Sequence, residues 1–138
     1  QRSPNGVMTM IASLRIPVML LGIAALGATA LAEGNAENGE TVFRKCRTCH
    51  DIGPNAKNKV GPHLNHVVGR KAASLEGYSY SPAFKALGEK GVVWNDETLL
   101  KYLAKPNDMV QRSKMVFPGL PDENDRKDVL AYLKKFSE

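Results

Sequence analysis

The sequence predicts an all-α fold of about five short helices that are joined by long loops. No stretch shows the sustained alternation of apolar and polar residues that is typical of a strand. Helix-capping residues are followed instead by apolar residues at helical spacing. Loops this long in a chain of 138 residues usually carry a function, and a large buried cofactor would supply the apolar surface that so small a core lacks.

The first helix is expected to begin near Asn35 and to carry Val42 and Phe43 towards a segment with two cysteines. Glu37 and Glu40 lie in its early turns, where negative charge complements the helix dipole. This helix therefore delivers the cysteine segment to whatever the domain binds.

The middle of the chain is expected to be mostly irregular. Residues 51–60 combine turn formers with lysines, and residues 61–70 also lack a helical pattern. Ser81 and Pro82 are a good N-cap and first-position pair, so a short helix is expected over residues 82–87, stopped at Gly88.

Two more helices are indicated near the C-terminus. Asn95 is placed to cap a helix that Pro106 ends. Pro121 and Asp122 open the last helix, in which the apolar residues fall on one face: Val129, Tyr132, Leu133 and Phe136.

The segment Cys46-Arg47-Thr48-Cys49-His50 has the spacing by which a haem is attached covalently. Thiols at positions i and i+3 of a helical turn point to the same side, so each could close a thioether to one porphyrin. His50 would then supply an imidazole nitrogen to the iron. A structural zinc site would need further cysteine or histidine ligands, and a disulfide would leave His50 unexplained. The motif therefore predicts one haem c.

The first 32 residues are expected to lie outside the domain. An apolar run over residues 16–31 follows Arg15 and closes on Ala30-Leu31-Ala32, which is the pattern of a secretory signal cleaved after Ala32. Residues 1–7 would be upstream sequence. An uncleaved membrane anchor is the alternative, since the run is slightly shorter than a bilayer requires. The sequence thus predicts export to the periplasm and a domain over residues 33–138.

Charge excludes one class of partner. Without Arg2 and Arg15, the domain keeps 17 basic and 14 acidic residues, a net charge of +3. Nucleic-acid binding usually needs a stronger basic stripe with interleaved aromatic residues, and none is evident. The mild excess is relevant to docking on a partner surface.

The second axial position of the iron has several candidates in the sequence, namely His63, His66, a lysine or a methionine, and it could also have no protein ligand. Met115 is favoured because it lies 65 residues after His50, inside the irregular segment 106–121, where the chain could cross to the other face of a porphyrin. A thioether suits low-valent iron. On spacing alone, Met109 competes with Met115.

From residue 39 to residue 136 the chain resembles a class I c-type cytochrome, close to the bacterial soluble proteins that are similar to mitochondrial cytochrome c. Eight elements carry this resemblance, in order along the chain: Gly39-x-x-x-Phe43, Gly61-Pro62-x-Leu64, Gly69-Arg70-Lys71, Gly77-Tyr78-Ser79-Tyr80, Trp94, Tyr102-Leu103 with Pro106, Lys114-Met115-x-Phe117-x-Gly119 and Leu130-Ala131-Tyr132-Leu133. One departure is that Ser81-Pro82-Ala83-Phe84 stands where the family commonly has an asparagine.

The resemblance implies a role for each matching residue. It makes Met115 the distal ligand and the Pro62 carbonyl the acceptor for the imidazole N–H of His50. Tyr102 would sit near the methionine sulfur, and Phe117 would close the exposed haem edge. Three further residues would hold a haem propionate: Arg70, Tyr80 and Trp94.

The expected function is that of a monomeric one-electron carrier, without enzymatic activity, because protein ligands would fill both axial positions. Its partners would be redox proteins such as a cytochrome bc complex, cytochrome c oxidase or a photosynthetic reaction centre. Lys45 and Lys114 would attract them, and three further lysines are candidates for the same role: Lys57, Lys59 and Lys105. The alternatives are a haem subunit permanently docked to a dehydrogenase or oxidase, and a ligand-binding haem protein with a displaceable methionine.

Overall fold

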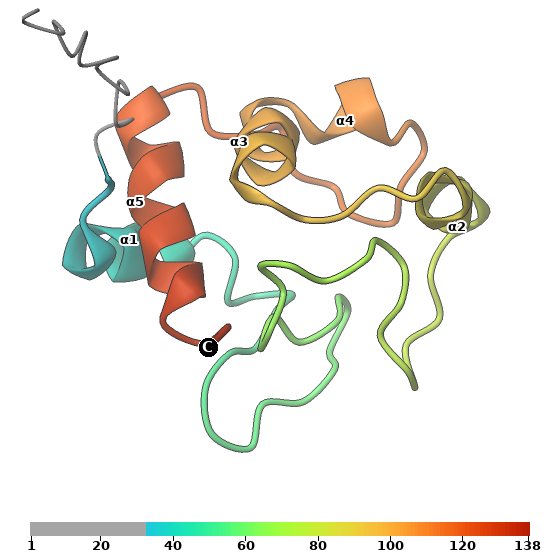
Figure 1. The fold of residues 1–138 in the computed structure, drawn as a ribbon, viewed down its shortest axis with the longest axis horizontal. Helices are drawn as coiled ribbons and strands as arrows, with labels where there is room; N and C mark the ends of the chain where they lie inside the picture. Colours follow the sequence, from blue (N-terminus) through green and yellow to red (C-terminus); the bar gives the residue numbers. More distant parts are fainter. Residues whose placement is uncertain (1–32) are drawn as a thin grey trace, which may run out of the picture.

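The computed structural model describes residues 33–138, and the predicted signal segment lies outside these residues (Figure 1). Within them the chain forms five helices and no named strand, with one isolated bridge between Lys71 and Val93. The prediction of an all-α fold with long loops is therefore confirmed. The helices are α1 (Ala36–Phe43), α2 (Pro82–Glu89), α3 (Asp96–Ala104), α4 (Pro106–Met109) and α5 (Glu123–Lys134).

Helices α1 and α5 come from opposite ends of the domain and pack directly on one another (Figure 1). Gly39 makes this close approach possible, because a Cβ there would overlap the carbonyl oxygen of Asp128. The backbone N–H of Asn35 donates to the Asp128 carboxylate at 2.7 Å, while the Asn35 side chain caps α1 at the Asn38 N–H. The start of the domain is thus fastened to its last helix.

The predicted caps lie where the sequence placed them. The Ser81 hydroxyl accepts from the Phe84 N–H at 3.2 Å, and Asn95 forms a reciprocal capping box with Thr98. The Asp122 side chain accepts from two N–H groups in the first turn of α5. Each cap satisfies donors that a helix end would otherwise leave unpaired.

The predicted end of α2 is wrong. Gly88 does not stop this helix, which continues to Glu89. Gly88 is instead needed for close packing, because a Cβ there would overlap the carbonyl oxygen of Ala72. The chain turns away at Gly91, where φ is +79° and a glycine is favoured.

Pro106 ends α3, as expected, and is also the first residue of the short helix α4. A proline lacks the N–H that a first helical position leaves unpaired, so one residue serves both purposes. The segment after α4, residues 110–122, returns to α5 without further helix.

The core lies between α1, α3 and α5 and extends under the loops. Its most deeply buried side chains include Phe43, Val110, Leu120 and Val129. Phe43 also stacks obliquely on Tyr132 of α5, with ring centroids 5.3 Å apart. Loops cover much of the remaining apolar surface. A large apolar cavity lies between these loops and the helices.

Candidate functional site

One cavity gathers side chains from the cysteine segment, the loops and α3. It encloses about 1040 Å³ of space between the atoms, part of it open to solvent. Ten of the residues singled out in the sequence line it: Cys46, Cys49, His50, Pro62, Arg70, Tyr80, Trp94, Tyr102, Lys114 and Met115. The fold therefore brings together residues that lie up to 69 positions apart in the sequence.

The cysteine segment continues from α1 as a tight turn. The N–H groups of Cys49 and His50 both donate to the carbonyl oxygen of Cys46, at 3.1 and 2.9 Å. Both thiols are free and half-buried in the cavity wall. Burial raises the pKa of Cys46 to about 11, an effect that the nearby Lys45 charge only partly offsets. This thiol therefore stays protonated at neutral pH.

The His50 imidazole is held from behind by the loop that follows. Its Nδ1 lies 2.6 Å from the carbonyl oxygen of Pro62. Proline has no N–H of its own, but its carbonyl accepts, so Nδ1 carries the proton and Nε2 is left with a lone pair. Burial lowers the pKa of His50 and keeps the ring neutral. A Cβ on the neighbouring Gly61 would overlap the imidazole ring, so only glycine leaves this space free.

Met115 lies in the wall of the same cavity, next to Tyr102. The Tyr102 hydroxyl donates to the Met115 sulfur at 3.3 Å, and the Met115 N–H donates to the hydroxyl of Ser113 at 2.9 Å. Burial raises the pKa of Tyr102 to about 12, although hydrogen bonding with Ser113 acts in the opposite direction. Ser113, which was not singled out from the sequence, thus orients the backbone that bears Met115.

Arg70, Tyr80 and Trp94 line the cavity together. Nη1 of Arg70 donates to the carbonyl oxygen of Asn65 at 3.3 Å, and burial lowers the pKa of the guanidinium. The Tyr80 hydroxyl accepts from the Leu75 N–H at 3.3 Å. A half-buried cation beside a phenol and an indole is a suitable environment for an anionic group.

Phe84 is a cavity residue that sequence reasoning missed. It stands in the segment that departs from the family pattern, and its ring stacks on Tyr80 and meets Tyr102 edge-on, with centroids 5.6 and 6.1 Å away. The segment in which the family commonly has an asparagine therefore contributes an aromatic side chain to the cavity wall. The only signal in the sequence was that Phe84 lies one turn after the cap at Ser81.

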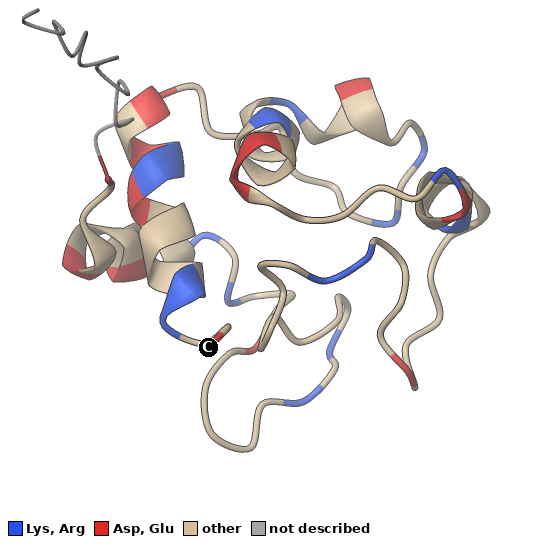
Figure 2. Cartoon of the chain, in the orientation of Figure 1, with Lys and Arg blue, Asp and Glu red and all other residues tan. Residues whose placement is uncertain are grey.

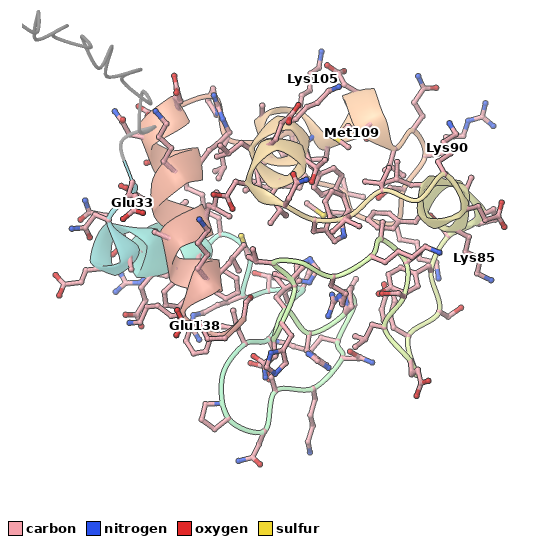
Figure 3. The ribbon with its side chains drawn as sticks, viewed as in Figure 1. Glu33, Lys85, Lys90, Lys105, Met109 and Glu138 are labelled. Atoms are coloured by element: carbon pink, nitrogen blue, oxygen red, sulfur yellow. The ribbon has the colours of Figure 1, made fainter. Side chains whose placement is uncertain are left out.

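Phe117 and Met109 lie away from the main cavity. Phe117 lines an adjoining hollow together with Met115, Arg112 and Ser113. Met109, which is labelled in Figure 3, ends α4 and packs against the core. Of the two methionines that competed on spacing, the structure brings Met115 into the cavity wall with His50.

His63 and His66 occupy the loop after Pro62, as expected from the sequence. His66 is exposed, and its φ of +58° puts it in the left-handed region. His63 is half-buried, and its Nδ1 has no hydrogen-bond partner among the described residues. Neither ring lines the cavity.

The two proposed docking lysines are exposed but engaged. Lys114 lines the cavity, and its ammonium donates to the carbonyl oxygen of Ser79 at 2.9 Å. Lys45 lies 3.8 Å from the carboxylate of Asp125 on α5. The other three lysines considered are exposed as well: Lys57, Lys59 and Lys105.

Charges are unevenly distributed over the fold. Figure 2 shows acidic residues gathered on α1 and at the start of α5. Lys59 donates to the carbonyl oxygen of Arg47, and Lys105 pairs with Asp108 at 3.5 Å. Residues 33–138 therefore carry an acidic end, formed by α1 and the first turn of α5, together with basic side chains on the loops.

The lining fits a haem. Most of the wall is apolar or aromatic, two free thiols sit one turn apart, an imidazole and a thioether are available as soft or borderline ligands, and one guanidinium offers an anion partner. Such a wall suits a flat apolar macrocycle with carboxylate substituents. It does not offer the four convergent ligands that a structural zinc ion takes.

Comparison with known proteins gives consistent results. No protein-family model matches the chain. It is 48% identical over 103 residues to cytochrome c2 of Rhodoblastus acidophilus, covering 75% of this chain and 94% of that protein. It is 45% identical over 116 residues to cytochrome c-554 of Methylosinus trichosporium, covering 84% of this chain and 86% of that protein. The structure of cytochrome c2 from Rhodospirillum centenum superposes with a TM-score of 0.72 at 44% identity, over 76% of this chain and 100% of that one.

Proposed function

This chain belongs to the class I c-type cytochromes and is therefore an electron-transfer protein with one covalently attached haem c, in which we propose that His50 and Met115 are the axial ligands of the iron. The observation that carries this assignment is that one cavity wall contains His50, Met115 and both cysteines. The haem iron supplies the one-electron cycle between its ferrous and ferric states. The residues of the chain attach the haem, ligate its iron and line its cavity.

Cys46 and Cys49 are the covalent attachment residues. Their turn holds both thiols in the cavity wall, and His50 follows directly. The Pro62 carbonyl oxygen, 2.6 Å from Nδ1 of His50, fixes the imidazole tautomer. Nε2 is thereby presented to the cavity, and the basicity of the ring is raised. Tyr102 and Ser113 hold Met115 through its sulfur and its N–H.

With both axial positions taken by side chains, no site is left for a substrate, which agrees with an electron carrier and not an enzyme. The aromatic wall formed by Tyr80, Phe84, Trp94 and Tyr102 would keep water away from this side of a bound haem. A dry site reduces the solvent rearrangement that accompanies a change of charge. Arg70, with Tyr80 and Trp94, would take a haem propionate, and Phe117 would cover the edge beside Met115.

The proposed location is the periplasm. The support is the signal pattern before residue 33 together with the relatives named cytochrome c2. Within residues 33–138, no helix is long and apolar enough to cross a membrane. The proposed working form is a monomer that shuttles between membrane redox complexes such as a cytochrome bc complex, cytochrome c oxidase or a photosynthetic reaction centre.

Exposure of the reduced protein to carbon monoxide at neutral pH tests the ligand assignment. A six-coordinate iron with Met115 in place should leave the haem spectrum unchanged. A rapid spectral change in the wild-type protein would favour the ligand-binding alternative with a displaceable methionine. The Met115→Ala variant is the positive control, because removal of the thioether should permit carbon monoxide to bind.

A further inference from the structure

The loop formed by residues 62–70, here called the proline loop, contributes four side chains to the cavity: Pro62, Leu64, Val67 and Arg70. It contains no helix or strand. Its position therefore depends on hydrogen bonds to other parts of the chain. Two bonds lie within the loop, from Val67 to Leu64 and from Arg70 to Val67, at 3.2 and 3.1 Å. Towards other parts of the chain, the Leu64 N–H donates to the carbonyl oxygen of Asp51 at 2.9 Å and the Gly69 N–H to that of Trp94 at 2.7 Å.

The last residues of the chain hold the middle of this loop. The carbonyl oxygen of Phe136 accepts from the His66 N–H at 2.8 Å, and the hydroxyl of Ser137 accepts from the Val68 N–H at 3.2 Å. Phe136 and Ser137 lie beyond the end of α5, and we call them the C-terminal clasp. Figure 1 shows the C-terminus beside the loops that follow the cysteine segment.

The clasp also touches the chain directly after His50. The Phe136 ring packs over Gly53, where a Cβ would stand 3.6 Å from its Cε1. Gly53 is in turn tied to the proline loop, because the Asn65 amide exchanges two hydrogen bonds with its backbone, at 2.8 and 2.9 Å. The clasp therefore contacts both the segment directly after His50, at Gly53, and the proline loop that binds the His50 imidazole.

Backbone strain makes these contacts necessary. His66 has a φ of +58°, a left-handed conformation that costs a non-glycine residue about 1 kcal/mol or more. The hydrogen bond from its N–H to Phe136 contributes about 1 kcal/mol, which is of the same size. Without the clasp, the two ends of the proline loop would keep their bonds to Asp51 and Trp94, but its middle, at His66 and Val68, would lose the contacts that hold this conformation.

We propose that Phe136 and Ser137 are positioning residues for the His50 imidazole, acting through the proline loop and the Pro62 carbonyl. This inference rests on the proposed function, in which His50 is an axial ligand. Ser137 is suited to the role because its hydroxyl does two things at once. It donates to the carbonyl oxygen of Leu133 at 3.0 Å, which directs its lone pairs towards the Val68 N–H.

The test is a set of holoprotein variants at this position. Ser137→Ala removes the acceptor of the Val68 N–H, so the Val68 amide should exchange with solvent about fivefold faster, the equivalent of one net hydrogen bond. The His66 amide, which donates to the adjoining Phe136 carbonyl, should exchange faster as well when the clasp loosens. The hyperfine-shifted ring resonances of His50 in the oxidised protein should move. The reduction potential should rise, since a weaker bond from Nδ1 to Pro62 lowers the basicity of the imidazole. Ser137→Thr keeps the hydroxyl and should restore all three.

A matched control separates positioning from loss of stability. Thr98→Ala removes the capping hydroxyl of α3, away from the clasp, and should leave the exchange of Val68 and His66 unchanged relative to amides of α1. Unmoved His50 resonances and potential in Ser137→Ala, with or without faster exchange, would overturn the inference. If the wild-type His50 ring shows no hyperfine shift at all, the axial assignment itself is wrong, which is a separate outcome.

Discussion

The hydroxyl of Tyr102 lies 3.3 Å from the sulfur of Met115 and donates a hydrogen bond to it. Tyr102 comes from α3 and Met115 from the segment after α4, so this contact joins a rigid helix to a loop without regular structure. A sulfur that accepts a hydrogen bond keeps one lone pair for a metal. The phenol therefore selects which side of the thioether faces the cavity.

Stability should depend on pH through this phenol. Burial raises the pKa of Tyr102 to about 12, above the ordinary value of 10.0, so the folded chain binds the proton more tightly than the unfolded chain. The resulting stability is fully present below pH 10 and is lost as the pH rises towards 12, for a total of about 3 kcal/mol. Urea unfolding of the wild type and of Tyr102→Phe at several pH values measures this difference. Equal losses in both proteins would contradict it.

Replacing Met115 should change the iron, whereas replacing Met109 should not. We expect Met115→Ala to lower the reduction potential and to admit external ligands, because a soft thioether favours the ferrous state. Met109→Ala removes a packed methionine from the end of α4 and should cost about 2 kcal/mol of stability or more without changing the haem spectrum. Potentiometric titration and optical spectra compare the two. The reverse pattern would make Met109 the ligand.

The sequence predicted those features that depend on local chemistry. Ser81, Asn95 and Asp122 cap their helices because a short polar side chain before a helix has few other uses. Gly88 was misread as a helix stop, since its real constraint is the Ala72 carbonyl, 16 residues earlier in the chain. No local pattern announces such a contact.

The same limit applies to the site. His50 and the two cysteines were evident from a five-residue motif, while Met115 needed the resemblance to a family, because Met109 fitted the spacing too. The bond of Lys114 to Ser79 and the support of Met115 by Ser113 depend on how loops meet in space. Hydrophobic periodicity carries no information about such contacts between loops.

The space that Gly61 leaves beside the His50 imidazole should be essential for the position of the ring. In Gly61→Ala the new methyl group would overlap the His50 ring, and we expect a loss of about 2 kcal/mol of stability together with a displaced axial ligand. Gly77→Ala is the matched control, because its φ of +77° imposes backbone strain while nothing lies within 4 Å of the added atom. Thermal unfolding and the haem spectrum distinguish the two variants. Identical spectra in both would show that His50 has room to move.

Each of the two thiols should contribute to the covalent retention of the haem. Cys46→Ala or Cys49→Ala leaves one thioether and should weaken attachment, since the two thiols of this turn serve one porphyrin. Extraction with acidified organic solvent measures what is retained. Release of haem from the wild type under these conditions would mean that the cofactor is not bound covalently.

Association with an acidic redox partner should be sensitive to salt, because the screening length falls from about 10 Å at 0.1 M to about 3 Å at 1 M. Charge reversal at Lys45 should slow the encounter by roughly tenfold at low salt and leave the potential unchanged. Lys114→Glu should slow the encounter too, and it should also shift the potential, since it removes the bond to Ser79 at the cavity wall. Stopped-flow mixing with a purified oxidase or reductase measures these rates. Rates that ignore salt and both variants would favour a permanently docked subunit.

The contact of Gly39 with Asp128 also has a consequence for the order of events during synthesis. Helix α1 leaves the ribosome first, but the backbone against which it packs belongs to α5, near the end of the chain. Pairing between such distant segments waits until the intervening loop has closed. Throughout that interval the cysteine segment, which follows α1 directly, is part of an unfolded chain and is exposed to solvent. The attachment chemistry therefore meets accessible thiols, before folding buries Cys46 in surroundings where burial raises the pKa of the free thiol to about 11.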